Sequence, residues 1–115
     1  QFAGEQDEVL LAAYLDGTGR VIKCEEIARG GHAHVPVDAY KIASGALICH
    51  AAGVAVAHNH PNGTATPSEA DMLATRRLEQ TLSGLGLQLV DHCVVARGKY
   101  ISICRLRAGQ MGQRR

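Results

Sequence analysis

A short, almost continuous apolar run, Gly53-Val54-Ala55-Val56-Ala57, constrains the fold of this chain more than any other segment. A run of this length without polar side chains is typical of a strand that is buried on both faces, because a strand with one wet face alternates between apolar and polar residues. The run therefore predicts a strand inside a sheet, not at its edge. His58 follows it directly.

The segments on either side of this run predict two hairpins and two helices. Residues 8–15 and 21–28 flank a turn at residues 16–19, and residues 87–96 and 100–104 flank a turn at 97–99. Apolar residues recur at helical spacing behind Asp38, and again behind Ser68. The order strand, strand, helix, strand, helix, strand, strand predicts an α/β or α+β protein with a mixed central sheet.

The chain of 115 residues has the size of one domain. We expect its ordered part to run from about residue 7 to residue 106, followed by an arginine-containing tail over residues 107–115. The tail is interpreted as a solvated segment, with a phosphate-contacting arm as the alternative.

The composition gives little support for a nucleic acid or a membrane as the binding partner. Twelve basic and 11 acidic side chains give a net charge of +1, which favours neither a polyanion nor an anionic membrane. Three Tyr, one Phe and no Trp leave no row of rings on which bases could stack. The four cysteines form no Cys-x-x-Cys pair, and no apolar run reaches the ~20 residues that cross a bilayer, so we expect a soluble, cytoplasmic protein.

The segment that follows the apolar run carries the chemistry. Residues two apart in an extended chain project to the same side, so His58 and His60 can aim two imidazoles at one point beyond the strand. The loop then returns to the start of a helix, where the Asp71 carboxylate can add a third ligand. Two His and one carboxylate leave a fourth position for water, which is the arrangement of a catalytic zinc.

Simpler interpretations exist for the same residues. Ser68 and Asp71 also form a capping box at a helix start, and two histidines at a strand end are often merely half-exposed. The combination of His-x-His-Pro, a loop rich in Gly and Pro, and Ser-x-x-Asp within fourteen residues favours the metal site.

On these residues the chain resembles the JAB/MPN (JAMM) metalloprotease superfamily, whose signature is His-x-His-Pro, a six-residue loop and Ser-x-x-Asp. It is most similar to the RadC-like branch, over residues 8–104. The matching segments are His58-Asn59-His60-Pro61-Asn62-Gly63, Thr66-Pro67-Ser68-Glu69-Ala70-Asp71, Leu89-Val90-Asp91-His92 and Tyr100-Ile101-Ser102. The resemblance implies a JAB/MPN-like (cytidine-deaminase-like) three-layer α+β fold with a mixed central sheet and two main helices.

The resemblance also implies roles. His58, His60 and Asp71 match the ligands of one Zn²⁺, and Ser68 matches the serine that positions water or stabilises the oxyanion. The family needs an upstream glutamate as general base, and counting back from Gly30 gives Glu25, with the adjacent Glu26 as the alternative.

Two features near this site stand apart from the ligand set. The segment with His32 and His34 departs from the family pattern, which puts the substrate in doubt more than the metal; this His-x-His pair has no carboxylate or Cys partner beside it, which disfavours a second metal site. His92, next to Asp91 on a late strand, is interpreted as structural and not as a ligand.

The resulting hypothesis is a zinc metallopeptidase or isopeptidase that cleaves a peptide or isopeptide bond near a flexible protein tail, such as that of a ubiquitin-like protein. The alternative is a non-catalytic, DNA-repair-associated binding module of the RadC type, which would bind a nucleic acid through the arginine tail with a salt-sensitive affinity. A third alternative is a purely architectural zinc, whose removal would unfold the domain.

Overall fold

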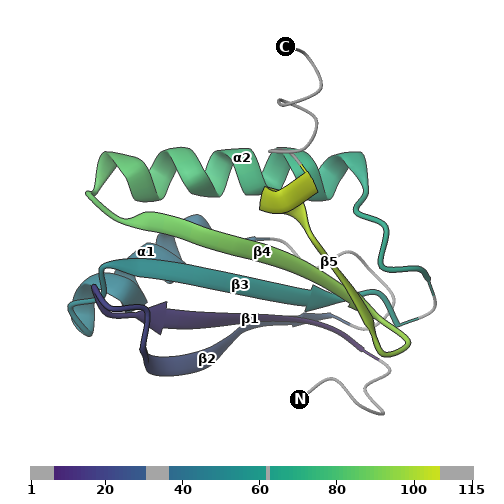
Figure 1. Ribbon diagram of the computed structural model, residues 1–115, viewed down its shortest axis with the longest axis horizontal. Coiled ribbons are helices and arrows are strands. Elements are labelled where there is room, and N and C mark those ends of the chain that lie inside the picture. Colours follow the sequence, from purple (N-terminus) through teal and green to yellow (C-terminus); the bar gives the residue numbers. More distant parts are fainter. Residues whose placement is uncertain (1–6, 31–36, 62, 107–115) are drawn as a thin grey trace.

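The computed structural model describes residues 7–30, 37–61 and 63–106, which form five strands and two main helices (Figure 1). A short helical turn follows the last strand at residues 103–106. The predicted order of elements is confirmed. The elements are β1 (Glu8–Leu15), β2 (Val21–Gly30), α1 (Ala39–Ile48), β3 (Gly53–Asn59), α2 (Glu69–Gly84), β4 (Gln88–Ala96) and β5 (Lys99–Ser102).

The strands form one mixed sheet in the order β2-β1-β3-β4-β5. Only β3 and β4 run parallel; the other neighbouring pairs are antiparallel. A parallel pair needs a long connection, and α2 provides it between β3 and β4 (Figure 1). The apolar run at residues 53–57 thus lies in the central strand, as its composition predicts.

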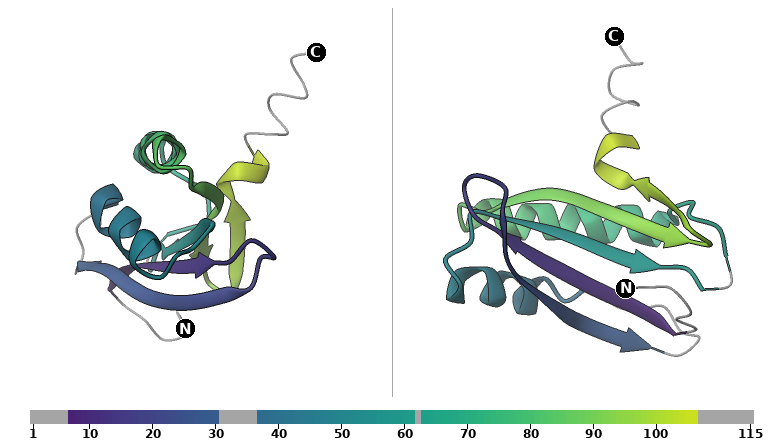
Figure 2. Two further views of the ribbon diagram at one scale, coloured as in Figure 1. Left: turned by 90° about the vertical axis from the view of Figure 1, so that its left-hand side faces the viewer. Right: turned by 60° about the horizontal axis from the view of Figure 1, so that its bottom comes forward.

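Both helices pack on the same face of the sheet (Figure 2). The mixed-sheet α+β fold is confirmed, but the described elements form two layers where the resemblance implied three. Alternate residues of β1 and β3 point toward the helices and build the core. This core contains Leu10, Ala12, Tyr14, Val54 and Val56 from the strands and Ile42, Ala43, Ala46, Leu78 and Leu82 from the helices.

The helix starts are set by the predicted side chains. Asp38 accepts a hydrogen bond from the Lys41 N–H at the start of α1. Ser68 and Asp71 form a capping box at the start of α2, each side chain bonding the other residue's backbone N–H. The capping interpretation of these two residues is therefore confirmed, and it does not exclude a further role for Asp71.

Tyr14 is buried under α1, and its hydroxyl donates to the Glu25 carboxylate on β2. The pKa of Tyr14 is raised, first by burial and then by this carboxylate. α1 comes close to the pair at Gly45, where an added Cβ would lie 2.6 Å from Glu25 Oε1. The contact therefore requires a glycine at this point of the helix.

Strand β2 is an edge strand with two irregularities in its pairing with β1, and one of them lies at Ile27. The pairing with β1 shifts register between Leu10 and Leu11, so Ile27 has no partner opposite it. The Lys41 ammonium of α1 donates to the Ile27 carbonyl at 2.9 Å. A lysine of the helix layer thus satisfies the carbonyl at the bulge.

Several sequence predictions fall outside the described residues. These are the His32 and His34 pair, Asn62 and the arginine tail at 107–115. Within the described ranges, no helix is both long enough and apolar enough to cross a membrane.

Candidate metal centre

The two histidines of the His-x-His pair lie where the central strand ends. His58 is the penultimate residue of β3 and is 4% exposed. His60 follows the strand, and its N–H still bonds the Val95 carbonyl of β4 at 2.8 Å. This last bond keeps the chain extended, so both rings point to the same side, as the spacing predicts.

Asp71 meets both rings from the first turn of α2. Its Oδ1 lies 3.2 Å from His58 Nε2, and its Oδ2 lies 3.2 Å from His60 Nε2. The two Nε2 atoms are 3.1 Å apart. The structure therefore brings together all three residues that the sequence analysis chose as ligands.

These spacings suit a tetrahedral ion. Zinc binds His nitrogen and carboxylate oxygen at about 2.0–2.1 Å, so two ligand atoms on one ion are about 3.3 Å apart. The two ring nitrogens are 3.1 Å apart and each lies 3.2 Å from one oxygen of Asp71, which is close to that edge length. The donor set of two imidazoles and one carboxylate is also one that zinc uses in catalytic sites.

Hydrogen bonds on the far side of His60 favour the same use. His60 Nδ1 lies 2.9 Å from the Thr64 carbonyl, which can only accept. His60 therefore carries its proton on Nδ1 and presents the lone pair of Nε2 to the cluster. A ring held this way by a backbone carbonyl is typical of a metal-ligating histidine.

Burial and charge shape the protonation of the cluster. Burial alone would raise the pKa of Asp71, but the contacts with His58 and the hydrogen bonds from Ser68 hold this pKa well below its usual value. His92, which lies behind His58, is fully buried; burial first and the nearby His58 second lower its pKa to about 3. Asp71 is thus an anion and His92 is neutral at physiological pH.

A second carboxylate, from Glu8 at the start of β1, also reaches this cluster. One carboxylate oxygen of Glu8 and one nitrogen each of His58 and His60 all lie within 4.8 Å of one another. Glu8 is 9% exposed. Local sequence patterns do not point to Glu8, because β1 and β3 are far apart in sequence and only their pairing, Leu10 opposite His58, joins them.

Asn59 holds the backbone around Glu8. Its Oδ1 accepts from the Val9 N–H at 2.6 Å, and its Nδ2 donates to the Asp7 carbonyl at 2.9 Å. The middle residue of the His-Asn-His motif therefore fixes β1 at the position that supplies the second carboxylate. This signal is present in the motif, but it needs the strand pairing to be understood.

The predicted base, Glu25, lies elsewhere. Its carboxylate accepts from Tyr14 and faces Gly45 of α1, and its strand is separated from β3 by β1. The alternative, Glu26, is exposed and forms an ion pair with Arg29. The structure brings neither glutamate to the His58 cluster.

Ser68 is exposed at the edge of the cluster. Its Oγ accepts from the Asp71 N–H at 3.0 Å, which leaves the hydroxyl proton for another acceptor. Its backbone N–H bonds Asp71 Oδ2 at 2.8 Å and so helps to orient the carboxylate between the two rings.

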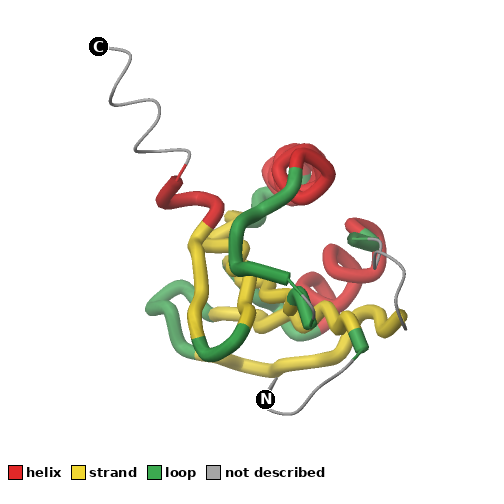
Figure 3. Tube along the Cα trace, turned by 90° about the vertical axis from the view of Figure 1, so that its right-hand side faces the viewer, coloured by secondary structure: helices red, strands yellow, loops and turns green. Residues whose placement is uncertain are grey.

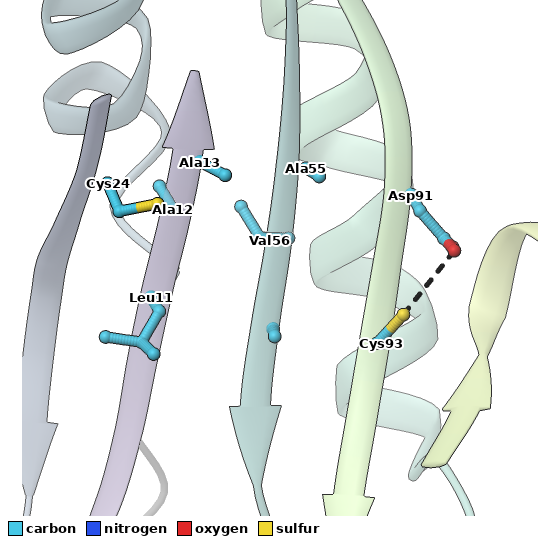
Figure 4. A pocket seen from close by; sticks show the side chains of 9 residues that line it. Leu11, Ala12, Ala13, Cys24, Ala55, Val56, Asp91 and Cys93 are labelled. Carbon is cyan, nitrogen blue, oxygen red and sulfur yellow. Dashed lines mark hydrogen bonds between the residues drawn. The ribbon is translucent and has the colours of Figure 1, made fainter. Parts of the chain in front are cut away.

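The opposite face of the sheet has a shallow apolar hollow, away from the helices (Figure 4). Alanine side chains of β1 and β3 form its floor, and Cys93 of β4 lies on its rim with its thiol 3.4 Å from Asp91 Oδ2. Residues Leu11, Ala12, Ala13, Cys24, Ala55, Val56, Ala57, Asp91 and Cys93 line it.

The fold and site define an α+β domain with two histidines and two carboxylates gathered at one end of a mixed sheet. Of these, His58, His60 and Glu8 form a group that could hold a metal ion. The family described as "RadC-like JAB domain" matches residues 1–109. This chain belongs to the RadC-like JAB domain family.

Curated relatives are similar to this chain over most of its length. A UPF0758 protein of Actinobacillus pleuropneumoniae serotype 5b (strain L20) is 40% identical over 102 residues, which is 89% of this chain and 46% of the relative. A UPF0758 protein of serotype 3 (strain JL03) matches to the same extent. The chain thus spans about half the length of the curated relatives it matches.

Proposed function

We propose that this domain is a zinc-dependent hydrolase that cleaves a peptide or isopeptide bond. The observation that carries the proposal is the convergence of His58, His60 and Asp71 at 3.1–3.2 Å, with the Glu8 carboxylate beside them. Bound there, zinc would supply a Lewis acid that polarises a carbonyl group and activates water for attack.

The chain's own residues divide the remaining work. His58, His60 and Asp71 hold the ion, because both Asp71 oxygens already face ring nitrogens. Glu8 takes the proton from the attacking water and returns it to the leaving amine, because its carboxylate lies within 4.8 Å of the ring nitrogens of His58 and His60 and so beside the reacting atoms. In this proposal Glu8 has the role for which the sequence pattern selected Glu25.

Ser68 completes the site. Its hydroxyl proton has no acceptor within the described ranges, and the residue is exposed at the mouth of the cluster. It is therefore placed to donate to the carbonyl oxygen as negative charge develops there. The family resemblance favours an extended protein tail as the substrate, and such a tail would approach the site from the side where Ser68 is exposed.

The first test measures the metal. We expect the purified chain to bind one zinc ion, and a His58→Ala, His60→Ala double variant to bind none. A wild-type chain without zinc, or a double variant that retains it, would contradict the ligand assignment.

The second test separates the ligand role from the base role. Fluorescein-labelled casein serves as an unstructured polypeptide probe. We expect Glu8→Gln to retain zinc and lose cleavage, Asp71→Asn to lose zinc, and Glu25→Gln to retain both. No zinc-dependent cleavage by the wild-type chain would contradict the hydrolase assignment, and cleavage by Glu8→Gln would remove this residue from the mechanism.

A further inference from the structure

A chain of buried hydrogen bonds behind His58 links three elements of the fold. His58 Nδ1 on β3 lies 2.7 Å from His92 Nε2 on β4. His92 Nδ1 lies 2.6 Å from Thr75 Oγ1 on α2, and this hydroxyl donates to the Asp71 carbonyl at 2.8 Å. His92 and Thr75 are both fully buried.

The position of every proton in this chain follows from its last member. The Thr75 hydroxyl has one proton, which it gives to the Asp71 carbonyl, so toward His92 it can only accept. His92 Nδ1 must therefore be the donor. His92 is fully buried and its two ring nitrogens contact only a hydroxyl and another imidazole, which favours the neutral ring with one N–H. His92 Nε2 is then an acceptor, and His58 Nδ1 must donate to it.

The result at His58 is a defined tautomer. With its proton on Nδ1, His58 leaves Nε2, the nitrogen that faces Asp71 Oδ1 and His60 Nε2, available to bind a metal. His60 reaches the same state by a shorter route, through the Thr64 carbonyl. Two independent sets of hydrogen bonds thus place the proton of both His58 and His60 on Nδ1.

We propose that Thr75 and His92 are positioning residues that fix His58 in the tautomer able to bind the metal. The proposal rests on the metal site of the proposed function. Thr75 is a buried residue of α2, and its described hydrogen bonds reach none of the ligand side chains. In this proposal it nevertheless determines which nitrogen of His58, on β3, stays unprotonated and can bind the metal.

Replacement of Thr75 by valine tests this assignment, because valine has a similar shape and no hydroxyl. The His92 Nδ1 proton would then be buried without an acceptor, which is unfavourable. The proton moves to Nε2, where it donates to His58 Nδ1, and His58 then carries its own proton on Nε2, facing the metal position.

Two substitutions serve as controls. Thr75→Ser keeps the hydroxyl. Thr81→Val makes the same chemical change on the same helix, since Thr81 Oγ1 also donates to the carbonyl four residues earlier, at 3.1 Å, but Thr81 is only half-buried and this bond is exposed.

The first measurement is zinc affinity by competition with a chromophoric chelator. We expect Thr75→Val to bind zinc about 10–100-fold more weakly than the wild-type chain, the range typical for lost partners of metal-ligating histidines. Thr75→Ser and Thr81→Val should remain within about threefold of wild type, far inside that range. Equal affinities for Thr75→Val and the wild type would overturn the proposal.

The second measurement reads the tautomers directly by long-range ¹H–¹⁵N NMR of the histidine rings in the metal-free chain. We expect His58 and His92 of the wild type to be protonated on Nδ1, and both to move to Nε2 in Thr75→Val. Wild-type His92 protonated on Nε2 would overturn the proposal, even if Thr75→Val did not fold.

The two readouts also separate this proposal from the proposed function. A chain that binds zinc but cleaves no polypeptide would contradict the hydrolase function. The zinc affinities of the variants would then still test the role of Thr75 and His92. A chain that binds no zinc would defeat the metal site, and the ring spectra would still decide which nitrogen of each histidine carries the proton.

Discussion

Asn59 holds Glu8 in place by bonding the backbone on both sides of it. The two bonds, to the Val9 N–H and to the Asp7 carbonyl, join the end of β3 to the start of β1. The histidines on either side of Asn59 face the metal position, while Asn59 itself aligns the strand that brings the second carboxylate to it. One tripeptide thus supplies both proposed histidine ligands and the support for the proposed base.

Replacement of Asn59 by alanine should affect both stability and turnover. Two hydrogen bonds are lost at a residue that is 4% exposed, and we expect the free energy of unfolding to fall by about 1–3 kcal/mol. Cleavage of casein should fall further than stability explains, because Glu8 is no longer aligned. Urea unfolding and turnover at saturating zinc measure the two effects.

Ser102→Ala is the matched control for Asn59→Ala. It removes the bond from the Ser102 hydroxyl to Asp91, 2.6 Å long, between β4 and β5. We expect a similar loss of stability with cleavage unchanged. If Asn59→Ala and Ser102→Ala lose turnover equally, alignment of Glu8 is not the cause.

The Tyr14 and Glu25 contact should act on stability alone. Tyr14→Phe removes the hydroxyl that donates to Glu25, and we expect a loss of about 1 kcal/mol, since Glu25 is only partly buried and regains water. Zinc affinity should stay unchanged. Guanidinium unfolding and zinc titration check this, and a loss of zinc binding in Tyr14→Phe would show that the pair does act on the metal centre.

The close approach of α1 to this pair predicts that Gly45 tolerates no side chain. An added Cβ would press on Tyr14 and Glu25, so Gly45→Ala should lower the free energy of unfolding by about 1–3 kcal/mol. Gly84 in the last turn of α2 has open space at the same position, and Gly84→Ala should be neutral or slightly stabilising. The midpoint of thermal unfolding should therefore fall in Gly45→Ala and stay the same or rise slightly in Gly84→Ala. Equal midpoints for the two variants would contradict the packing.

Cys93 should react slowly with alkylating agents at neutral pH. Burial first and the Asp91 carboxylate second raise the pKa of this thiol to about 11, and only the thiolate reacts. The rate should therefore rise steeply as the pH approaches 11, and Asp91→Asn should raise the rate at pH 8. Pulsed iodoacetamide labelling with peptide mapping measures it.

The exposed Cys24 is the internal comparison for this labelling, because it borders the same hollow. We expect Cys24 to be labelled well before Cys93 at pH 8. Equal rates for the two thiols at that pH would contradict the environment assigned to Cys93.

Local patterns in the sequence predicted most of the fold. The apolar run before His58 identified the central strand, and the Asp38 and Ser68 caps fixed where both helices begin. The number of layers could not be obtained this way, because a helix pattern shows which of its faces is apolar but not which face of the sheet that helix covers. Only the packed structure shows α1 and α2 on the same side (Figure 3).

The candidate site divides in the same manner. His58, His60 and Asp71 fall within fourteen residues, so spacing alone suggested them. Glu8 and Thr75 are far from His58 in the sequence, and strand pairing and helix packing bring them to it, which local spacing does not encode. Counting along the family pattern led to Glu25, whose carboxylate in the structure accepts a hydrogen bond from the Tyr14 hydroxyl.

The bulge at Ile27 has a consequence for association between molecules. Strand β2 forms the long outer border of the sheet, where a strand from a second molecule would otherwise find a template. A second strand that paired with β2 would have to follow its shifted register. It would also find the Ile27 carbonyl already bound by the Lys41 ammonium. The irregularity therefore protects the domain against uncontrolled polymerisation along this edge of the sheet.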